Sequence, residues 1–265
     1  MANTKTLLTC AGTCSCVLLI LVLTACGKKN QPNPDPPTGG EKPVNLTTLV
    51  PQKLEQPQLQ ISLSYGKIAG QLISLAQSDG LSEKLAYNDQ QRLKRYERYQ
   101  KSELIYLVDY TWDDTGKVIR ASQHLVELNG KSTTPLGYYD VELNAASNIS
   151  SVKWYNLNDQ LLKTVIYNYS ESGTVNTVVN TSPDIKPTGY TYDDKNGLFK
   201  KVSSCQFLAL ENNLSLLRSE KSNVIRQTGA SLPYTYNYTY NKEGYPVTIT
   251  SFDEKGAQTS WKVTY

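Results

Sequence analysis

Paired carboxylates are the residues of this chain most able to do chemistry. Asp113-Asp114 and Asp193-Asp194 could act as general acid and base, or bind Ca²⁺ through their oxygens. Both pairs, however, occupy the same place in a repeated turn, "YTWDDTGKVI" and "YTYDDKNGLF". An Asp at the start of a turn accepts hydrogen bonds from backbone N–H groups. The pattern therefore favours turn formation. A carboxylate-based hydrolase would have to use acids outside the turns, such as Asp109, Glu127 and Glu142.

Other catalytic arrangements have little support. His124 is the only histidine, so a His/Cys zinc cluster is not available, and a Ser-His-Asp arrangement would need this residue as its base. Cys205 would be the single thiol left after export, and we expect it to be buried and inert. We predict no catalytic residue, no metal site and no cofactor, and an enzyme is the less favoured interpretation.

The elements that must position these residues begin after an export signal. Lys5 is the only charge before the apolar run "VLLILVLTAC" at residues 17–26. Leu23-Thr24-Ala25-Cys26 resembles the bacterial lipobox, in which the cysteine is acylated and becomes the first residue of the mature protein. Residues 1–25 are therefore predicted to be a lipoprotein signal peptide, with Cys26 lipidated and attached to the membrane. An ordinary signal peptide or a transmembrane anchor is the alternative.

The next segment reads as a linker. Residues 26–43 contain "GKKNQPNPDPPTGG", which is rich in Pro and Gly and cannot form a core. Gly27 stands where the aspartate of inner-membrane lipoproteins would be, and the acidic surface-export signal of Bacteroidetes lipoproteins is missing. By resemblance, this implies an outer-membrane lipoprotein that faces the periplasm rather than the cell surface. Residues 44–265 are expected to form a single β-rich domain.

Composition limits the function classes. Without Lys5, 26 of the 27 basic side chains remain against 24 acidic ones, a balance of +2, which does not favour nucleic acid as a partner. The chain has 19 Tyr but 3 Phe and 3 Trp. Tyrosine suits a face that is apolar on one side and wet at its tip. This composition indicates an open sheet with half-exposed faces.

Alternation gives the fold class. In "YTYNYTY", residues 234–240, four tyrosines face one way and Thr or Asn the other, which is the period-2 pattern of a strand. Similar strands are joined by short polar links that usually contain Gly, as in hairpin loops. We therefore predict a mainly β fold, an antiparallel meander of hairpins forming a curved, partly open sheet. Residues 44–86 depart from the repeat, and their structure is left open.

These units resemble a known family of repeats. "YNYSESGTV", "GYTYDDKNGLFK" and "YTYNYTYNKEGYPVTI" are similar to the tyrosine-aspartate (YD) repeats of Rhs-type proteins and to Bacteroidetes lipoproteins of unknown function. The resemblance covers about the last 180 residues and is densest after Gly189. It implies a curved antiparallel sheet on a lipid anchor and supplies no catalytic residue.

One segment interrupts the strands. In "SCQFLALENNLSLLRSEKSN", Phe207, Leu210, Leu214 and Leu217 fall on one helical face. We predict a short inserted helix laid over the sheet, with partner binding as the alternative. A second unusual stretch is "QRLKRYERYQK", residues 91–101, whose cations and tyrosines could bind anionic glycans or lipid headgroups. A solvated strand is the favoured interpretation of that stretch.

The aromatic surface is the best functional lead. Exposed Tyr and Trp side chains on a rigid sheet can stack on sugar rings or on a partner protein, although the same side chains also stabilise sheets through cross-strand pairs. The predicted binding surface consists of Trp112, Trp154, Tyr236, Tyr238 and Trp261. We therefore expect a lipid-anchored, non-enzymatic envelope protein that binds a glycan or an envelope partner protein. A carboxylate-based hydrolase and a purely structural component are the alternatives.

Overall fold

The computed structural model describes residues 49–265, except residues 117, 128–131, 183, 213–214 and 230–232. The strands are β1 (Lys53–Gln56), β2 (Leu59–Tyr65), β3 (Leu72–Gln77), β4 (Leu81–Tyr87), β5 (Leu93–Gln100), β6 (Glu103–Trp112), β7 (Val118–Val126), β8 (Thr133–Leu143), β9 (Ile149–Tyr155), β10 (Leu161–Tyr169), β11 (Val175–Asn180), β12 (Thr188–Tyr192), β13 (Val224–Thr228), β14 (Tyr234–Tyr240), β15 (Pro246–Phe252) and β16 (Gln258–Thr264). A short helix, α1 (Cys205–Glu211), and a 3₁₀ turn, η2 (Ser215–Arg218), separate β12 from β13. The predicted signal peptide, Cys26 and the linker lie outside the described residues.

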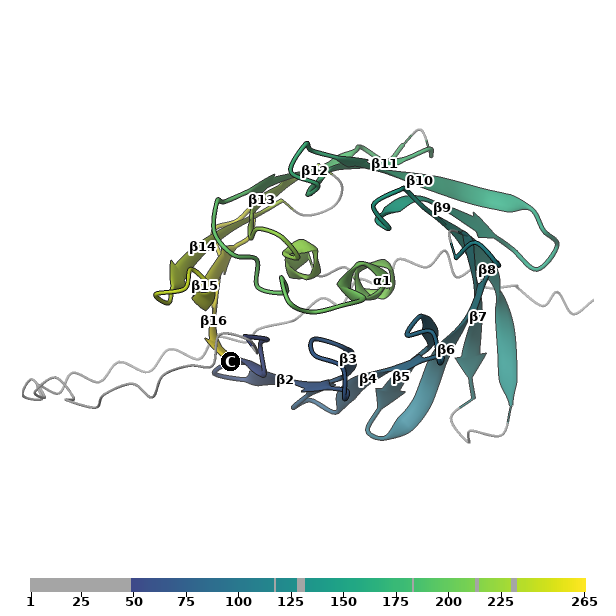
Figure 1. Cartoon of the computed structure of the whole chain (residues 1–265), viewed down its shortest axis with the longest axis horizontal. Helices are drawn as coiled ribbons and strands as arrows, with labels where there is room; N and C mark the ends of the chain where they lie inside the picture. Colours follow the sequence, from purple (N-terminus) through teal and green to yellow (C-terminus); the bar gives the residue numbers. More distant parts are fainter. Residues whose placement is uncertain (1–48, 117, 128–131, 183, 213–214, 230–232) are drawn as a thin grey trace, which may run out of the picture. The chain divides into compact units, whose positions relative to one another are not determined.

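The strands form a closed antiparallel barrel (Figure 1). Each strand pairs with the next, and β16 returns to β1 through the pairs Lys53 with Thr264 and Leu54 with Val263. The prediction of a curved, partly open sheet is therefore wrong. Closure depends on β1, which lies in the part of the sequence that does not show the repeat. By pairing the first strand with the last, the barrel removes both sheet edges.

The inserted helix lies inside the ring of strands and not over an open sheet (Figure 1). We call residues 193–223, between β12 and β13, the plug. Phe207 and Leu217, two of the predicted helical face, are buried in the core, and Leu210 packs against it. Leu214 is outside the described residues. The plug is needed because the inward side chains of a barrel this wide would otherwise face an unfilled lumen.

The tyrosines of the C-terminal strands point inward. Tyr236 is buried, and the hydroxyl of Tyr238 donates to the Val224 carbonyl at 2.7 Å. Thr235, Asn237 and Thr239 alternate with them and are exposed. The alternation was correctly read as a strand. Its tyrosine face is now assigned to the barrel interior, where the core cluster includes α1 and η2 residues.

The turn at Asp253 follows β15 and lies at the opposite end, but the other repeated turns lie at one end of the barrel, where even-numbered strands end. We call this the aromatic end. The first turn residue accepts backbone N–H groups through its side chain: Asn88 Oδ1 accepts from Gln90 and Arg92, and Asp253 Oδ1 from Lys255 and Ala257. In the plug, Asp193 Oδ1 likewise accepts from the backbone N–H groups of Lys195 and Asn223. The plug is thus an enlarged version of the same turn.

An aromatic residue lies at or near the end of every even-numbered strand except β8, which ends at Leu143, and it has a defined structural role. Its polar hydrogen is donated to a backbone carbonyl at the start of the preceding strand, across a place where the two strands separate. These bonds, 2.7–3.0 Å long, run from Tyr65 to Pro51, Tyr87 to Leu72, Trp112 to Leu93, Tyr169 to Ile149, Tyr238 to Val224 and Tyr265 to Pro246. Tyr192 is the exception, since its buried hydroxyl has no hydrogen-bond partner within the described part of the chain.

This difference allows a matched test. Tyr169→Phe should lower the free energy of unfolding by about 1 kcal/mol, because the Ile149 carbonyl loses its donor. Tyr192→Phe should be neutral or slightly stabilising, because it removes a buried hydroxyl that makes no hydrogen bond to any residue the structure describes. Urea unfolding of both variants measures the difference. An equal loss of unfolding free energy in both variants would show that the hydrogen bonds from these tyrosine hydroxyls to backbone carbonyls do not stabilise the barrel.

Candidate functional site

The five residues predicted to form a binding surface all pack against the core from the inner wall. Trp112 donates its Nε1–H to the Leu93 carbonyl, and its ring meets Phe207 of the plug with centroids 6.0 Å apart. Trp154 lies under the ammonium group of Lys163, and Tyr236 is bonded to Ser215 of η2. Tyr238 and Trp261 complete the set. That they bind a ligand stays a prediction, and any such ligand would have to enter the barrel.

The acids proposed for a hydrolase lie apart on the wall. Asp109 on β6 forms two hydrogen bonds with Arg95 at 2.6 and 2.9 Å, and Glu142 on β8 accepts from Lys153 at 2.7 Å. Glu127 follows β7 at the opposite end from the turns. The Lys153 ammonium and the Ser151 hydroxyl lower the pKa of Glu142, so that it stays a carboxylate. Each of these two bonded acids therefore serves an ion pair and not a shared reaction centre.

The remaining chemical candidates are structural. Cys205, at the first position of α1, is buried as expected, and burial raises the pKa of its thiol well above the ordinary value. His124 lies on β7 opposite Pro135 of β8. No group of three or more His, Cys, Asp or Glu that could hold a metal ion occurs among the described residues.

A buried ion cluster attaches the plug to the wall. Arg98 of β5 lies 3.4 Å from the Glu83 carboxylate of β4, and its guanidinium also donates to the backbone carbonyl of Glu211 at 2.7 Å. Tyr96 donates its hydroxyl to Glu83, and Asn212 donates to the other Glu83 oxygen at 3.1 Å. The Glu83 side chain is 4% exposed, so its charge is stabilised by these partners rather than by water.

The carboxylate of Glu211, the last residue of α1, lies among three wall tyrosines. It accepts hydrogen bonds from the hydroxyls of Tyr106, Tyr110 and Tyr139, and the last of these is the shortest. Burial raises the pKa of Tyr110 and of Tyr139 well above the ordinary value, which keeps both hydroxyls as donors. Burial also raises the pKa of Glu211. Helix and wall are therefore joined by polar contacts as well as by apolar packing.

The sequence contained a signal for this cluster. Tyr96 and Arg98 are two residues apart in the stretch that we interpreted as a solvated strand, so they must share one face. A tyrosine in phase with the core places Arg98 on the inner face. Arg95, on the same strand, instead pairs outward with Asp109. The solvated-strand interpretation is correct for Arg95 and wrong for Arg98.

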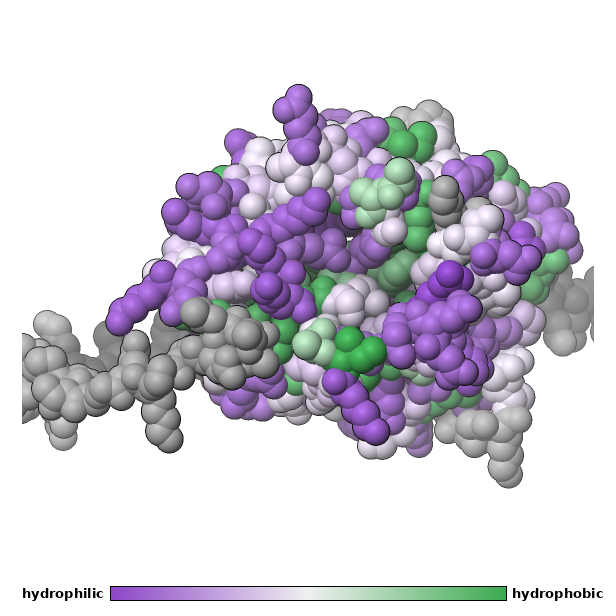
Figure 2. Space-filling model, in the orientation of Figure 1, coloured by the Kyte–Doolittle hydropathy of each residue, from purple (hydrophilic) through white to green (hydrophobic). Residues whose placement is uncertain are grey.

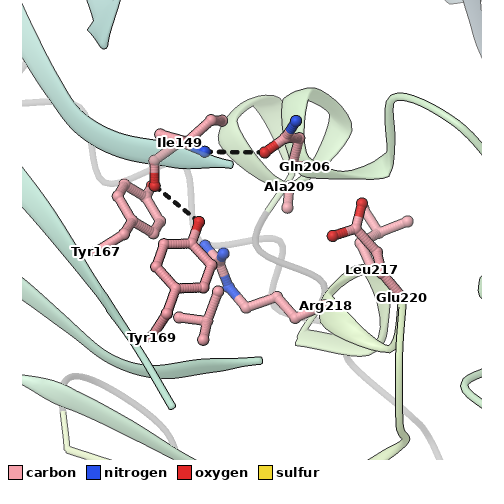
Figure 3. A pocket seen from close by; sticks show the side chains of 9 residues that line it. Ile149, Tyr167, Tyr169, Gln206, Ala209, Leu217, Arg218 and Glu220 are labelled. Carbon is pink, nitrogen blue, oxygen red and sulfur yellow. Dashed lines mark hydrogen bonds between the residues drawn. The ribbon is translucent and has the colours of Figure 1, made fainter. Parts of the chain in front are cut away.

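A second polar group lines a small hollow beside η2 (Figure 3). The Arg218 guanidinium lies 5.2 and 5.4 Å from the ring centres of Tyr167 and Tyr190, a cation–π arrangement. Glu220 lies next to it, and burial raises the pKa of this carboxyl to about 7. The hollow has room for about one water molecule. The hollow therefore contains a proton-accepting carboxyl inside the barrel and is too small to be a ligand cavity.

The outer wall has the opposite character. Its exposed positions carry Thr, Ser, Asn and ion pairs such as Arg120 with Asp140 at 2.8 Å and Lys153 with Glu142 at 2.7 Å. Figure 2 shows hydrophilic residues around most of the ring and apolar residues towards its middle. Membrane-spanning barrels instead carry an apolar band about 25 Å tall on the outside. The polar pairs named here do not form such a band. Separately, no described helix is long and apolar enough to cross a membrane.

An open groove lies on this outer wall between β3 and β4. The two strands pair only from Ser74 with Lys84 to Ala76 with Ser82, and beyond that point they separate towards the aromatic end. The groove measures about 590 Å³. Its lining consists of Gln71, Ile73, Lys84, Leu85, Ala86, Tyr87, Asn88, Asp89, Gln91 and Glu97.

The groove combines hydrogen-bonding groups with small apolar faces. Tyr87 closes its inner side by donating to the Leu72 carbonyl, and Gln71 donates to Gln91 at 2.7 Å across the loops. The Glu97 carboxylate accepts the Tyr99 hydroxyl. Sequence analysis missed this site because most of it lies between residues 71 and 89, where the repeat is weak. The separation of two paired strands depends on register, which no local pattern revealed.

Comparisons with known proteins give distant likenesses only. No family model matches the chain, and no curated protein matches it. Two solved structures described as porin-like proteins, from Bacteroides uniformis and Bacteroides vulgatus, are similar at 11% and 12% identity, with TM-scores of 0.40 and 0.38. The two matches cover 81% and 82% of this chain, and 96% and 98% of the respective neighbour's chain. A structure of TcdB2-TccC3-Cdc42 is similar at 12% identity over 77% of this chain and 10% of that chain, with a TM-score of 0.29. The chain thus has distant structural neighbours among porin-like Bacteroides proteins, and its function must be argued from its own residues.

Proposed function

We propose that this chain is a non-enzymatic, lipid-anchored binding module of the cell envelope that takes a glycan in the groove between β3 and β4. The observation that carries the proposal is the groove itself, an open space of about 590 Å³ on a wall whose interior is packed. A closed barrel with a bonded plug is a rigid support, and rigid supports lose little entropy when a ligand binds.

The lining favours a saccharide. Asp89, Asn88 and Gln91 supply carboxylate and amide groups, which hydrogen-bond to pairs of hydroxyls, while Ile73 and Tyr87 supply apolar surface for the C–H face of a sugar ring. Cationic and anionic side chains are both present in the groove, so a neutral glycan fits better than a highly charged one. The groove lies on the outer wall and is separate from the five predicted aromatic residues, which pack against the core from the inner wall.

Attachment to the envelope is part of the same proposal. The lipobox-like Leu23-Thr24-Ala25-Cys26 supports acylation of Cys26, and residues 27–48 then link the lipid to the barrel. We propose an outer-membrane lipoprotein that faces the periplasm. The hydrophilic wall supports this arrangement, because a barrel that faces water needs a separate anchor to stay at a membrane.

Filling the groove tests the ligand site. Ala86 is an exposed residue of β4 that lines the groove, and Ala76 is an exposed residue of the neighbouring β3 outside it. Ala86→Trp should abolish binding to the neutral envelope glycan identified on a glycan array, a loss of at least about tenfold in affinity. Ala76→Trp should leave that affinity unchanged. Equal affinity for both variants, or no glycan bound by the parent chain, would refute the proposed site.

A further inference from the structure

Exposed apolar side chains of this barrel are concentrated in one sector. Among the described residues, nine large apolar side chains are exposed, and seven of them lie between residues 125 and 185. Six of these are at the end of the barrel where odd-numbered strands end, opposite the aromatic end. We call this group the leucine rim, and it consists of Leu125, Leu136, Leu157, Leu161, Leu162 and Ile185. Leu157 and Leu162 are 60% and 62% exposed.

The members of the rim are neighbours in space. Leu125 of β7 pairs with Thr134, near the start of β8. A Cβ on Gly137 would lie 2.3 Å from the Tyr155 carbonyl oxygen and 3.3 Å from Asn156 Cα, so Leu136 and Leu157 come next to each other. Leu161 pairs with Tyr155 across the next hairpin. The rim therefore gathers at the end of β7–β10 and in the loop after β11, and exposed apolar groups of this kind mark interaction sites.

Aromatic and cationic groups border the leucine rim. Tyr138 and Tyr155 stack with ring centres 4.8 Å apart on the outer wall, and Arg120 lies 4.2 Å from the Tyr138 ring centre. Leucine tips bordered by Tyr and Arg side chains match the composition of surfaces that enter the headgroup region of a bilayer.

We infer that the leucine rim inserts into the surface of the lipid bilayer to which Cys26 is attached. This inference rests on the proposed lipid anchor. Residues 27–48 are 48 − 26 = 22 residues, which span up to about 70 Å when extended. The longest strand, β8, has 11 residues, about 37 Å along its own direction and less along the barrel axis. The linker can therefore reach past the barrel from the aromatic end, where Tyr65 bonds Pro51.

The anchor makes a weak insertion effective. A barrel held within tens of ångströms of a bilayer meets it at a high effective concentration, so a few leucine side chains suffice to fix its orientation. Insertion of the leucine rim turns the aromatic end, and with it the groove between β3 and β4, away from the lipid. The two ends of the barrel then have separate roles, attachment at one and ligand binding at the other.

The test places a fluorescent dye on the full lipidated chain in vesicles of phosphatidylethanolamine and phosphatidylglycerol. Leu157→Cys puts the dye on the leucine rim, and Ile73→Cys puts it on an exposed apolar residue at the aromatic end. Cys205 is buried and protected from labelling. Lipids with a nitroxide in the acyl chain should quench the dye at position 157 and leave the dye at position 73 unquenched. Adding Leu161→Asp and Leu162→Asp should abolish quenching at position 157.

Each outcome decides a separate point. Flotation with the vesicles is scored first, and a chain that does not float refutes the lipid anchor. A chain that floats but shows no quenching at position 157, or equal quenching at both positions, overturns the bilayer contact while the anchor stands. Self-quenching between dyes at position 157 without lipid quenching would assign the leucine rim to a second copy of the chain instead. Glycan binding is measured separately, on the chain without a dye at position 73, because Ile73 lines the groove.

Discussion

Arg98→Ala is expected to lower the free energy of unfolding by about 3 kcal/mol, because it leaves the Glu83 carboxylate buried without a cation. Glu83 is 4% exposed, so water cannot replace the lost partner. The substitution also removes the donor to the Glu211 carbonyl at the end of α1 and the cation over the rings of Tyr96 and Tyr106. Removal of one partner from a buried pair costs more than the pair contributes to the fold.

The same strand offers a matched control. Arg95 also pairs with a carboxylate, that of Asp109, but both side chains are about 40% exposed. Arg95→Ala should cost less than about 1 kcal/mol, since water solvates the remaining charge. Urea unfolding monitored by circular dichroism compares the two variants. A similar loss for both would mean that the inner cluster contributes no more than a surface pair.

The destabilisation caused by Arg98→Ala should appear first in the plug. Trp112 meets Phe207 of α1, so its fluorescence reports whether the helix stays in place. In Arg98→Ala, hydrogen exchange at the amides of α1 should become faster than exchange in β9 and β10, because local opening precedes global unfolding. Uniform acceleration over the whole barrel would contradict a specific role of Arg98 in holding the plug.

The local structure of this chain was predictable because it depends on neighbours in sequence. The Asp and Asn residues of the turns accept backbone N–H groups as expected, and Asp193 does so even though its turn was enlarged into the plug. The segment with alternating tyrosines at residues 234–240 is a strand, as predicted. Both features follow from side-chain spacing and from backbone donors within a few residues.

Closure was not predictable because alternation is the same in an open sheet and in a barrel. Nothing in "YTYNYTY" tells whether its inner face meets water or a plug. The deciding contact joins β1 to β16, the two most distant strands of the sequence, and β1 is only "KLEQ". The excess of tyrosine over phenylalanine was read as a sign of half-exposed faces. In the barrel the hydroxyls instead bond backbone carbonyls and the plug acids Glu211 and Asp193.

For the candidate site too, local features were predictable from the sequence and the contacts between strands were not. The basic character of residues 91–101 was visible, but the assignment of Arg98 to the interior required the phase of the strand relative to a core that the sequence did not reveal. The groove between β3 and β4 arises where two strands stop pairing after Ser74 and Lys84. Such a separation is a property of register and twist, so it appears only when neighbouring strands are placed together.

The second large effect concerns pH. Burial raises the pKa of Glu220 from 4.5 to about 7, with Arg218 opposing the shift. A carboxyl whose pKa is raised in the folded state stabilises the fold fully below about pH 4.5, and this contribution is lost as pH rises through about 7. This difference in pKa corresponds to at most roughly 3.4 kcal/mol. Because the side chain is only partly buried, we expect about 2 kcal/mol. Burial raises the pKa of Glu211 as well, which gives a slope of the same sign.

Glu220→Gln should therefore flatten the pH dependence between about pH 4.5 and 7 and leave the barrel more stable than the parent chain at pH 8. A neutral amide keeps the size of the protonated acid and does not charge as pH rises, so the cost of placing a carboxylate beside the small hollow disappears. Glu103→Gln, on an exposed glutamate at the start of β6, is the control and should keep the parent slope. Urea unfolding at several pH values measures both. A parent chain whose stability is flat, or rises, between pH 5 and 7 would contradict a buried Glu220 that takes up a proton, and would place this carboxyl in firm charge balance with Arg218 instead.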